Sequence, residues 1–67
     1  MLYPVLAAEM AKRRIKKRQL AELLGINYKS FYNKWTGKTP FTWPEVSKIR
    51  EAYFPDMVSD ELFAMSR

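Results

Sequence analysis

The chain of 67 residues contains no cysteine and no histidine. The lack of cysteine excludes disulfide bonds, and the lack of both residues excludes the zinc sites of small zinc-finger proteins. Histidine is also the commonest proton carrier in enzymes, the acidic residues are scattered, and no glycine-rich phosphate loop is present. We therefore expect no enzyme, and no metal ion, cofactor or small-molecule ligand.

Long apolar runs are also missing, since none approaches the roughly 20 residues that a membrane-spanning helix needs. In the N-terminal stretch MLYPVLAAEMAKRR the positive charge follows the apolar residues, which is the reverse of a secretory signal. There are only two glycines and no repeats, while 48% of the residues are hydrophobic. These features predict one compact domain over residues 1–67, located in the cytoplasm and without a membrane partner.

Positive charge is concentrated in the middle of the chain. The net charge is +5, but residues 12–50 hold 11 lysine and arginine residues against Glu22 and Glu45, which gives +9 for this segment. Residues 51–67 carry four acidic residues against Arg67. A basic middle with an acidic tail indicates a polyanionic partner that meets one region only, although a basic patch can also serve solubility alone.

Apolar residues recur at helical spacing, and no segment alternates with the period of two that a strand requires. The pattern predicts a first helix from about Pro4 to Arg13. A second helix, in KRQLAELLG, ends at Gly25, and Asn27 starts a third helix as its N-cap. This tight turn between two short helices predicts a helix-turn-helix in an all-α domain.

Two further helices are predicted from their caps. Thr42 and Glu45 form the capping box of a fourth helix, which ends before Pro55. Ser59 is placed to cap a short fifth helix. Apolar residues of this last region are either core or the surface through which two copies of the chain associate: Phe54, Met57, Val58, Phe63 and Met65.

The segment NYKSFYNKWTGK, residues 27–38, places four aromatic residues among three lysines. At about 100° per residue, the rings share one arc of the third helix and the polar residues share another, without any acidic residue. Phe31 and Trp35 are predicted to fill the core. Tyr28 and Tyr32 lie at its border, where they either cover the core edge or lie against a DNA backbone or thymine methyl groups. A polar face without acids suits phosphates and base edges, which favours DNA binding.

The second helix begins with Lys16, Lys17 and Arg18 and has no N-cap of the usual residue types. Positive charge at a helix N-terminus opposes the helix macrodipole. A phosphate docked there would accept hydrogen bonds from the unpaired N–H groups and neutralise the lysines. Without such a partner the lysines would extend into solvent. We favour the phosphate interpretation.

The segment LAELLGINYKSFYNKWTGK resembles the helix-turn-helix of the lambda-repressor/Cro family, with its LAxxLGI run, polar N-cap and helix ending at glycine. The stretches YPVLAAEMAKRRI, FYNKWTGKTPFTWPE, FPD and DELF extend the resemblance to small phage- and prophage-associated regulators. It implies a compact five-helix domain whose third helix lies in the major groove. Many members have glycine where Arg14 stands, so we expect the first helix to end less cleanly or Arg14 to adopt a positive φ. Many also have other residues where Lys16 and Lys17 stand.

The resemblance also assigns roles in DNA binding by position. It implies contacts with base edges by four residues: Tyr28, Lys29, Tyr32 and Asn33. Asn33 can bond adenine in a bidentate way, and Lys29 can reach guanine. Phosphate contacts are expected from six residues: Lys16, Lys17, Asn27, Ser30, Thr36 and Lys38. Lys34 is predicted to pair with a carboxylate instead.

We therefore predict a sequence-specific, Cro- or repressor-like transcriptional regulator from a phage or prophage, binding a double-stranded DNA operator and associated with the nucleoid of a bacterial cell or phage-infected host. Its small footprint favours a homodimer, at least on DNA. One alternative is an antitoxin-type module that binds both its operator and a toxin protein. Another is a protein-interaction domain that has lost DNA binding, whose third helix should then carry acidic or bulky apolar residues.

Overall fold

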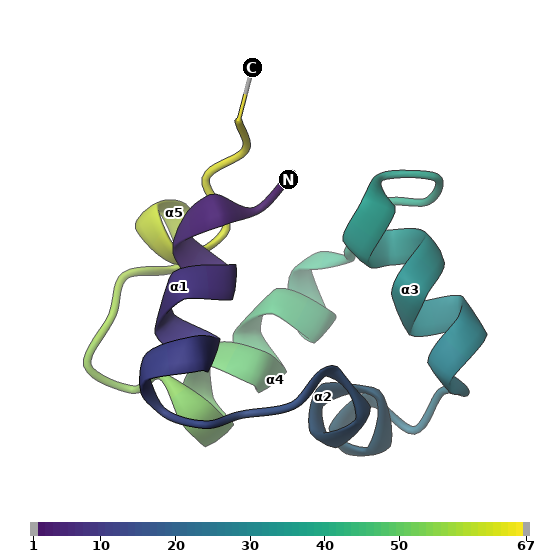
Figure 1. The fold of residues 1–67 in the computed structure, drawn as a ribbon, viewed down its shortest axis with the longest axis horizontal. Coiled ribbons are helices and arrows are strands. Elements are labelled where there is room, and N and C mark those ends of the chain that lie inside the picture. Colours follow the sequence, from purple (N-terminus) through teal and green to yellow (C-terminus); the bar gives the residue numbers. More distant parts are fainter. Residues whose placement is uncertain (1, 67) are drawn as a thin grey trace.

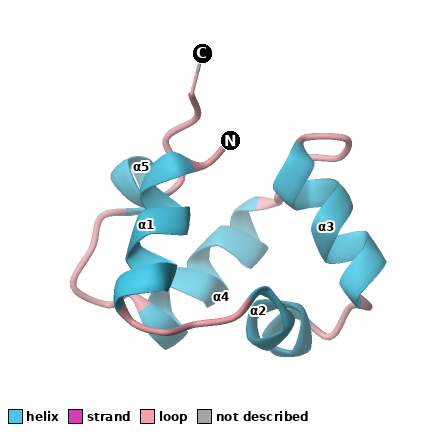
Figure 2. Cartoon of the chain, in the orientation of Figure 1, coloured by secondary structure: helices cyan, strands magenta, loops and turns pink. Residues whose placement is uncertain are grey.

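Five helices make up residues 2–66, the part of the chain that the computed structural model describes (Figure 1). They are α1 (Pro4–Lys12), α2 (Lys17–Leu24), α3 (Tyr28–Thr36), α4 (Trp43–Tyr53) and α5 (Ser59–Leu62). Loops alone connect them, and no residue of this range belongs to a strand (Figure 2). The prediction of an all-α, five-helix domain is confirmed, and none of the helices within residues 2–66 is long and apolar enough to cross a membrane.

The helices α2 and α3 form the predicted helix-turn-helix. Figure 1 shows α2 almost end-on while α3 extends across the view, so the two axes cross steeply. Gly25, with φ 69°, ends α2 in the left-handed conformation that glycine adopts without strain. The Asn27 side chain then accepts a hydrogen bond of 2.8 Å from the Ser30 N–H and starts α3. Both local determinants of the turn are therefore confirmed.

The C-termini of α1, α2 and α3 end in the same way, with one left-handed residue and two backbone hydrogen bonds to the last turn. At the end of α1, the Ile15 N–H donates to the Met10 carbonyl at 2.8 Å and the Arg14 N–H to the Ala11 carbonyl at 3.3 Å. The helices α2 and α3 have glycine at the left-handed position, whereas α1 has Arg14 there, with φ 56°. The expectation of a positive φ at Arg14 is confirmed.

Arg14→Gly is expected to raise the free energy of unfolding by about 0.5–1 kcal/mol. Glycine removes a left-handed penalty of roughly 1–2 kcal/mol, part of which is offset by its greater freedom in the unfolded chain. The Arg14 side chain is exposed and has no hydrogen bond or ion pair within residues 2–66, so no contact is lost. Denaturant unfolding measures the change. Arg14→Ala keeps the β-carbon and should change stability much less; equal stabilisation by both variants would contradict the conformational explanation.

The cap of α4 is confirmed and the cap predicted for α5 is wrong. Glu45 Oε1 accepts from the Thr42 N–H at 2.8 Å, and Thr42 Oγ1 accepts from the Glu45 N–H at 3.4 Å. At α5 the N-cap is Val58, without a side-chain hydrogen bond, and Ser59 is already the first helical residue. The Val58 carbonyl accepts from the Leu62 N–H at 3.0 Å, so the single turn forms without help from the Ser59 hydroxyl.

The core lies where the five helices meet, and each of them contributes at least one buried residue. Phe31 is fully buried at its centre, as predicted, and its ring packs edge-on against Phe41 with 5.8 Å between ring centroids. Trp35 was also predicted to fill the core, but it is only partly buried and packs against the core from its edge. The buried residues are Tyr3, Leu6, Met10, Leu20, Ala21, Phe31, Ile49, Phe54 and Leu62.

The tail residues predicted to mediate self-association fall into different environments. Phe54 is fully buried, so of the two alternatives it belongs to the core. Met57 and Phe63 are partly buried against the core. Val58 and Met65 are 61% and 64% exposed and remain available to a partner.

Candidate nucleic-acid interface

The exposed side of α3 is formed by Lys29, Tyr32 and Thr36, which recur at helical spacing. Tyr28 and Asn33 flank this line, the first exposed and the second partly buried. All four residues predicted to contact base edges therefore lie on one connected surface. Tyr32 is not at the border of the core as predicted, because its side chain is 48% exposed and lies in the middle of the exposed side.

Two polar side chains of this surface are uncommitted, whereas the Thr36 hydroxyl donates to the Asn33 carbonyl at 3.3 Å. Neither the Asn33 amide nor the Lys29 ammonium has a hydrogen-bond or ion-pair partner among residues 2–66. The backbone of Asn33 is held in place, since its carbonyl accepts from the Lys38 N–H at 2.9 Å where α3 ends. The helix contains no aspartate or glutamate. The surface therefore offers hydrogen-bond donors, and an amide that can both donate and accept, without any charge that would repel phosphate.

Lys34 is tied to the protein, as predicted. Its ammonium lies 3.0 Å from Glu45 Oε1 and 3.2 Å from the Pro40 carbonyl oxygen, which connects α3 to the start of α4. Burial raises the pKa of Glu45, but the hydrogen bonds from the Thr42 N–H and from Lys34 outweigh it, so the pKa lies below its ordinary value. Lys34 is thus one lysine of α3 that is not available to DNA.

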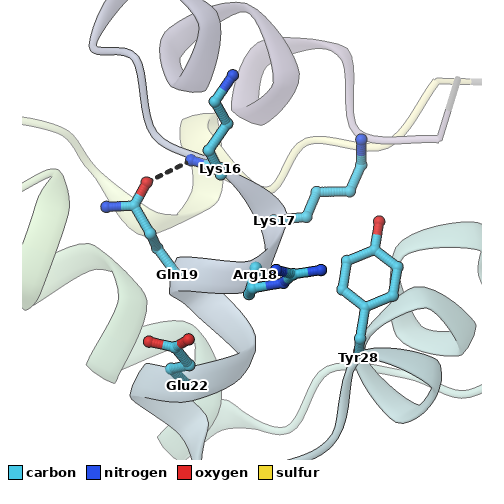
Figure 3. A pocket seen from close by; sticks show the side chains of 6 residues that line it. All are labelled: Lys16, Lys17, Arg18, Gln19, Glu22 and Tyr28. Atoms are coloured by element: carbon cyan, nitrogen blue, oxygen red, sulfur yellow. Dashed lines mark hydrogen bonds between the residues drawn. The ribbon is translucent and has the colours of Figure 1, made fainter.

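An open cleft at the N-terminus of α2 lies beside the start of α3 (Figure 3). It is lined by Lys16, Lys17, Arg18, Gln19, Glu22 and Tyr28. Gln19 Oε1 accepts from the Lys16 N–H at 2.7 Å, which caps the helix from inside its first turn. This cap was not predicted, because a glutamine in the third helical position is not one of the usual N-cap residues that precede a helix. The Gln19 N–H donates to the Lys16 carbonyl at 3.0 Å, while the N–H groups of Lys17 and Arg18 still point out of the helix end.

The ammonium of Lys17 is placed between the two helices. It lies 5.0 Å from the centre of the Trp35 ring, within the range of a cation–π interaction. In Figure 3 the Lys17 ammonium and the Tyr28 hydroxyl extend toward the same side of the cleft. The aromatic contact restrains a side chain that would otherwise move freely in solvent.

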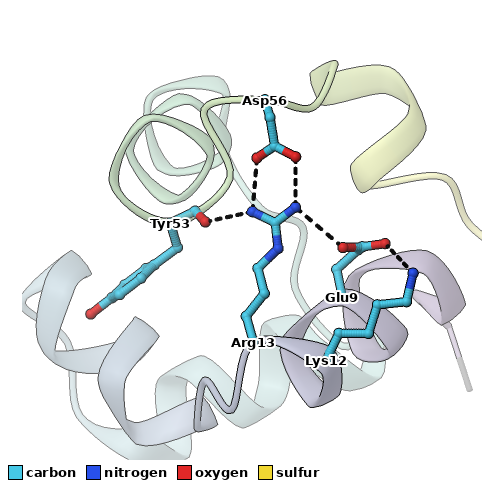
Figure 4. Close-up of polar contacts among 5 residues, drawn as sticks. All are labelled: Glu9, Lys12, Arg13, Tyr53 and Asp56. Carbon is cyan, nitrogen blue, oxygen red and sulfur yellow. Dashed lines mark hydrogen bonds and ion pairs between the residues drawn. The ribbon is translucent and has the colours of Figure 1, made fainter.

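Arg13 belongs to a network that holds the domain together (Figure 4). Its guanidinium donates to both carboxylate oxygens of Asp56 at 2.8 Å and to the Tyr53 carbonyl at the end of α4 at 3.0 Å. Glu9 lies 3.3 Å away and also pairs with Lys12. The hydrogen bonds from Arg13 hold the pKa of Asp56 below its usual value. Arg13 and Lys12 belong to the basic segment of residues 12–50 that was predicted to meet a polyanion, but both are paired with carboxylates of the protein.

The other residues predicted to contact phosphate lie within α3 or next to its two ends. Thr36 and Lys38 are exposed at its C-terminal end and Asn27 is exposed at its N-terminal end, whereas Ser30 is partly buried. The side-chain Oδ1 of Asn27 accepts the cap hydrogen bond, so the side-chain NH₂ group of Asn27 is left to donate to another partner. The structure thus brings the predicted residues to the exposed side of α3, to its two ends and to the start of α2.

No curated protein and no solved structure matches the chain. A family model, described as the Cro/C1-type HTH DNA-binding domain, matches residues 5–53. The matched region contains α1 to α4, including the helix-turn-helix and the exposed surface of α3. The chain belongs to the Cro/C1-type helix-turn-helix DNA-binding domains.

Proposed function

We propose that the protein is a sequence-specific transcriptional regulator of a phage or prophage that binds an operator with α3 in the major groove. The main support is the exposed side of α3, which combines an uncommitted amide, an uncommitted lysine and two exposed tyrosines without any acidic group. An amide can bond both edges of adenine, and lysine can reach guanine. The protein acts in the cytoplasm, on the nucleoid, where an occupied operator blocks RNA polymerase or a competing regulator.

The contacts divide into two kinds. Base edges are read by Tyr28, Lys29, Tyr32 and Asn33, while phosphates are held by Lys16, Lys17, Asn27, Ser30, Thr36 and Lys38. Phosphate contacts fix the register of the protein on the duplex, and the base contacts select the sequence. The start of α2 supports the phosphate contacts. Its lysines have no ion pair within residues 2–66, and the lysines and the helix dipole both favour an anion at this helix end.

The protein binds as a homodimer on two half-sites. The domain measures 26 × 26 × 22 Å, so one copy fits within one DNA turn of about 34–36 Å and leaves the next turn to a second copy. Trp43 and Val58, 67% and 61% exposed, line one groove together with Arg50 and Asp60. Across a two-fold axis, Arg50 of one copy can face Asp60 of the other.

Selection of bound sequences from random duplexes tests this function. We expect enrichment of a pair of inverted half-sites whose centres lie about 10 base pairs apart. Failure to enrich any sequence, together with the absence of binding to any duplex at low salt, would contradict the proposal. Direct repeats or a single half-site would contradict the symmetric dimer alone.

Lys17→Ala is expected to lower the slope of log affinity against log salt concentration by about one unit, because one phosphate contact is lost. Binding to the operator at several salt concentrations measures the slope. Lys12→Ala is the matched control, since it removes the same charge from an ammonium that pairs with Glu9. Loss of the Trp35 contact alone would lower stability and leave the slope unchanged, so an unchanged slope removes Lys17 from the phosphate contacts.

A second candidate function is an antitoxin-type module that binds the same kind of operator and also a toxin protein. Of the four acidic residues that follow residue 50, Asp56 is paired with Arg13, and the other three, Glu51, Asp60 and Glu61, favour a basic partner. A neighbouring gene for a basic toxin, and co-purification of its product with this protein, distinguish this candidate from a regulator that acts alone.

A further inference from the structure

The side chains of Tyr28 and Tyr32 form a separate apolar surface on α3. They are 45% and 48% exposed, and their rings stack with 6.3 Å between centroids and 25° between planes. Among residues 2–66 neither ring contacts another aromatic residue, whereas Phe31 joins the buried rings through Trp35 and Phe41. The pair therefore does not belong to the core, and its stacking fixes both rings on the outside of the helix.

The position of the two rings indicates whether they contact base edges or the DNA backbone. Tyr32 lies at the middle of the exposed side of α3, between Lys29 and Thr36. The cations suited to phosphate lie on either side of Tyr32, at the start of α2, where Tyr28 lines the same cleft, and just beyond the end of α3. A helix inserted in the major groove directs the middle of its exposed side to the floor and its ends to the walls. Tyr32 is thus aimed at base pairs, and the Tyr28 ring at the start of α3 extends the same surface through its stacking on Tyr32.

The major groove offers one apolar group to such a surface, the C5-methyl group of thymine. On the assumption of the proposed function, we infer that Tyr28 and Tyr32 read thymine methyl groups in each half-site of the operator. The face has no carboxylate to accept from the N4 amino group of cytosine, and Asn33 beside the pair is suited to adenine. The operator is therefore read mainly through A·T base pairs at the positions that the pair covers.

Replacement of thymine by deoxyuridine, one position at a time, in the selected operator tests this inference. The replacement removes one methyl group and leaves every hydrogen-bonding group in place. At one or two thymines in each half-site we expect wild-type affinity to fall about fourfold, which corresponds to the burial of one methyl-sized group. At the other thymines the replacement should have no effect.

Three variants, two at Tyr32 and one at Tyr28, assign the effect to the tyrosines. Tyr32→Ala should bind the thymine and deoxyuridine forms of the sensitive position equally, while Tyr32→Phe should retain the fourfold difference because it keeps the ring. Thermal melting verifies that both variants are folded, as expected for a half-exposed side chain. Tyr28→Ala should remove the discrimination at the neighbouring sensitive position.

Three results would overturn the inference. The first is equal affinity of the wild type for thymine and deoxyuridine at every position, and the second is discrimination that persists in both alanine variants. In either case the operator is still bound and the proposed function stands. The third is a selection that enriches no sequence, which overturns the proposed function as well.

Discussion

Phe31→Ala is expected to leave most of the protein unfolded at 37 °C in the absence of DNA. Phe31 is fully buried and lies between the rings of Trp35 and Phe41, so that truncation leaves a cavity bordered by several elements. Loss of a buried phenylalanine costs about 3–5 kcal/mol. A domain of this size without disulfide bonds or metals has a total stability of roughly 3–5 kcal/mol. The substitution therefore removes most or all of it.

Thermal and denaturant unfolding followed by circular dichroism measure this effect. Tyr32→Ala is the matched control, because it truncates an aromatic ring on the same helix at a position that is 48% exposed, and it should cost less than about 1 kcal/mol. Saturating operator DNA should partly restore the folded state of Phe31→Ala, since a ligand that binds only the folded form stabilises it. A Phe31→Ala protein that melts close to the wild type would show that the core is not built around this ring.

Elements with local determinants could be predicted from the sequence. Asn27 caps α3 through the N–H three residues later, and Thr42 and Glu45 cap α4 over the same spacing. Such contacts depend on residues that are close in the chain and on few conformations, so the residue types alone indicate them. The left-handed Arg14 was expected on other grounds, because the family that the sequence resembles often has glycine at this position, whereas arginine itself gives no such signal.

The buried side of α3 differs most from what the sequence predicted. The helical wheel placed Phe31 and Trp35 in the core and Tyr28 and Tyr32 at its border. In the structure only Phe31 is fully buried, and the buried side is turned toward Lys34, whose side chain is only 15% exposed. Burial of a lysine requires a partner, and Glu45 with the Pro40 carbonyl provides one from the next helix. Hydrophobicity on a wheel assigns lysine to solvent, so it could not show that Tyr32 moves to the middle of the exposed side.

Long-range pairing was the other feature that the sequence could not reveal. Arg13 and Asp56 are 43 positions apart and form a bidentate pair across α1 and the end of α4. In the sequence Arg13 is one of several basic residues in a run, and nothing in its neighbours separates it from Lys16 or Lys17. In the structure Lys12, Arg13 and Lys34 are paired with carboxylates of the protein. The charge available to DNA is therefore smaller than the +9 of residues 12–50 suggests.

Asn33→Ala is expected to weaken binding to the operator by about 1–3 kcal/mol and to leave binding to unrelated duplexes almost unchanged. The Asn33 amide has no partner within residues 2–66, so its removal breaks no internal hydrogen bond. Alanine also has a higher helix propensity than asparagine, and the carbonyl that closes α3 is kept. The loss therefore belongs to the contact with a base, and the melting temperature of the variant should not fall.

The base that Asn33 reads can be identified by combining this variant with single base-pair changes in the operator. If Asn33 bonds one adenine, replacing that adenine should weaken the wild type but should cost Asn33→Ala little more, since the contact is already absent. At every other position the losses from the protein and the DNA changes should add. Additive losses at all positions, or an equal loss on specific and unrelated duplexes, would remove Asn33 from base recognition and would leave the tyrosine pair and Lys29 as the source of sequence preference.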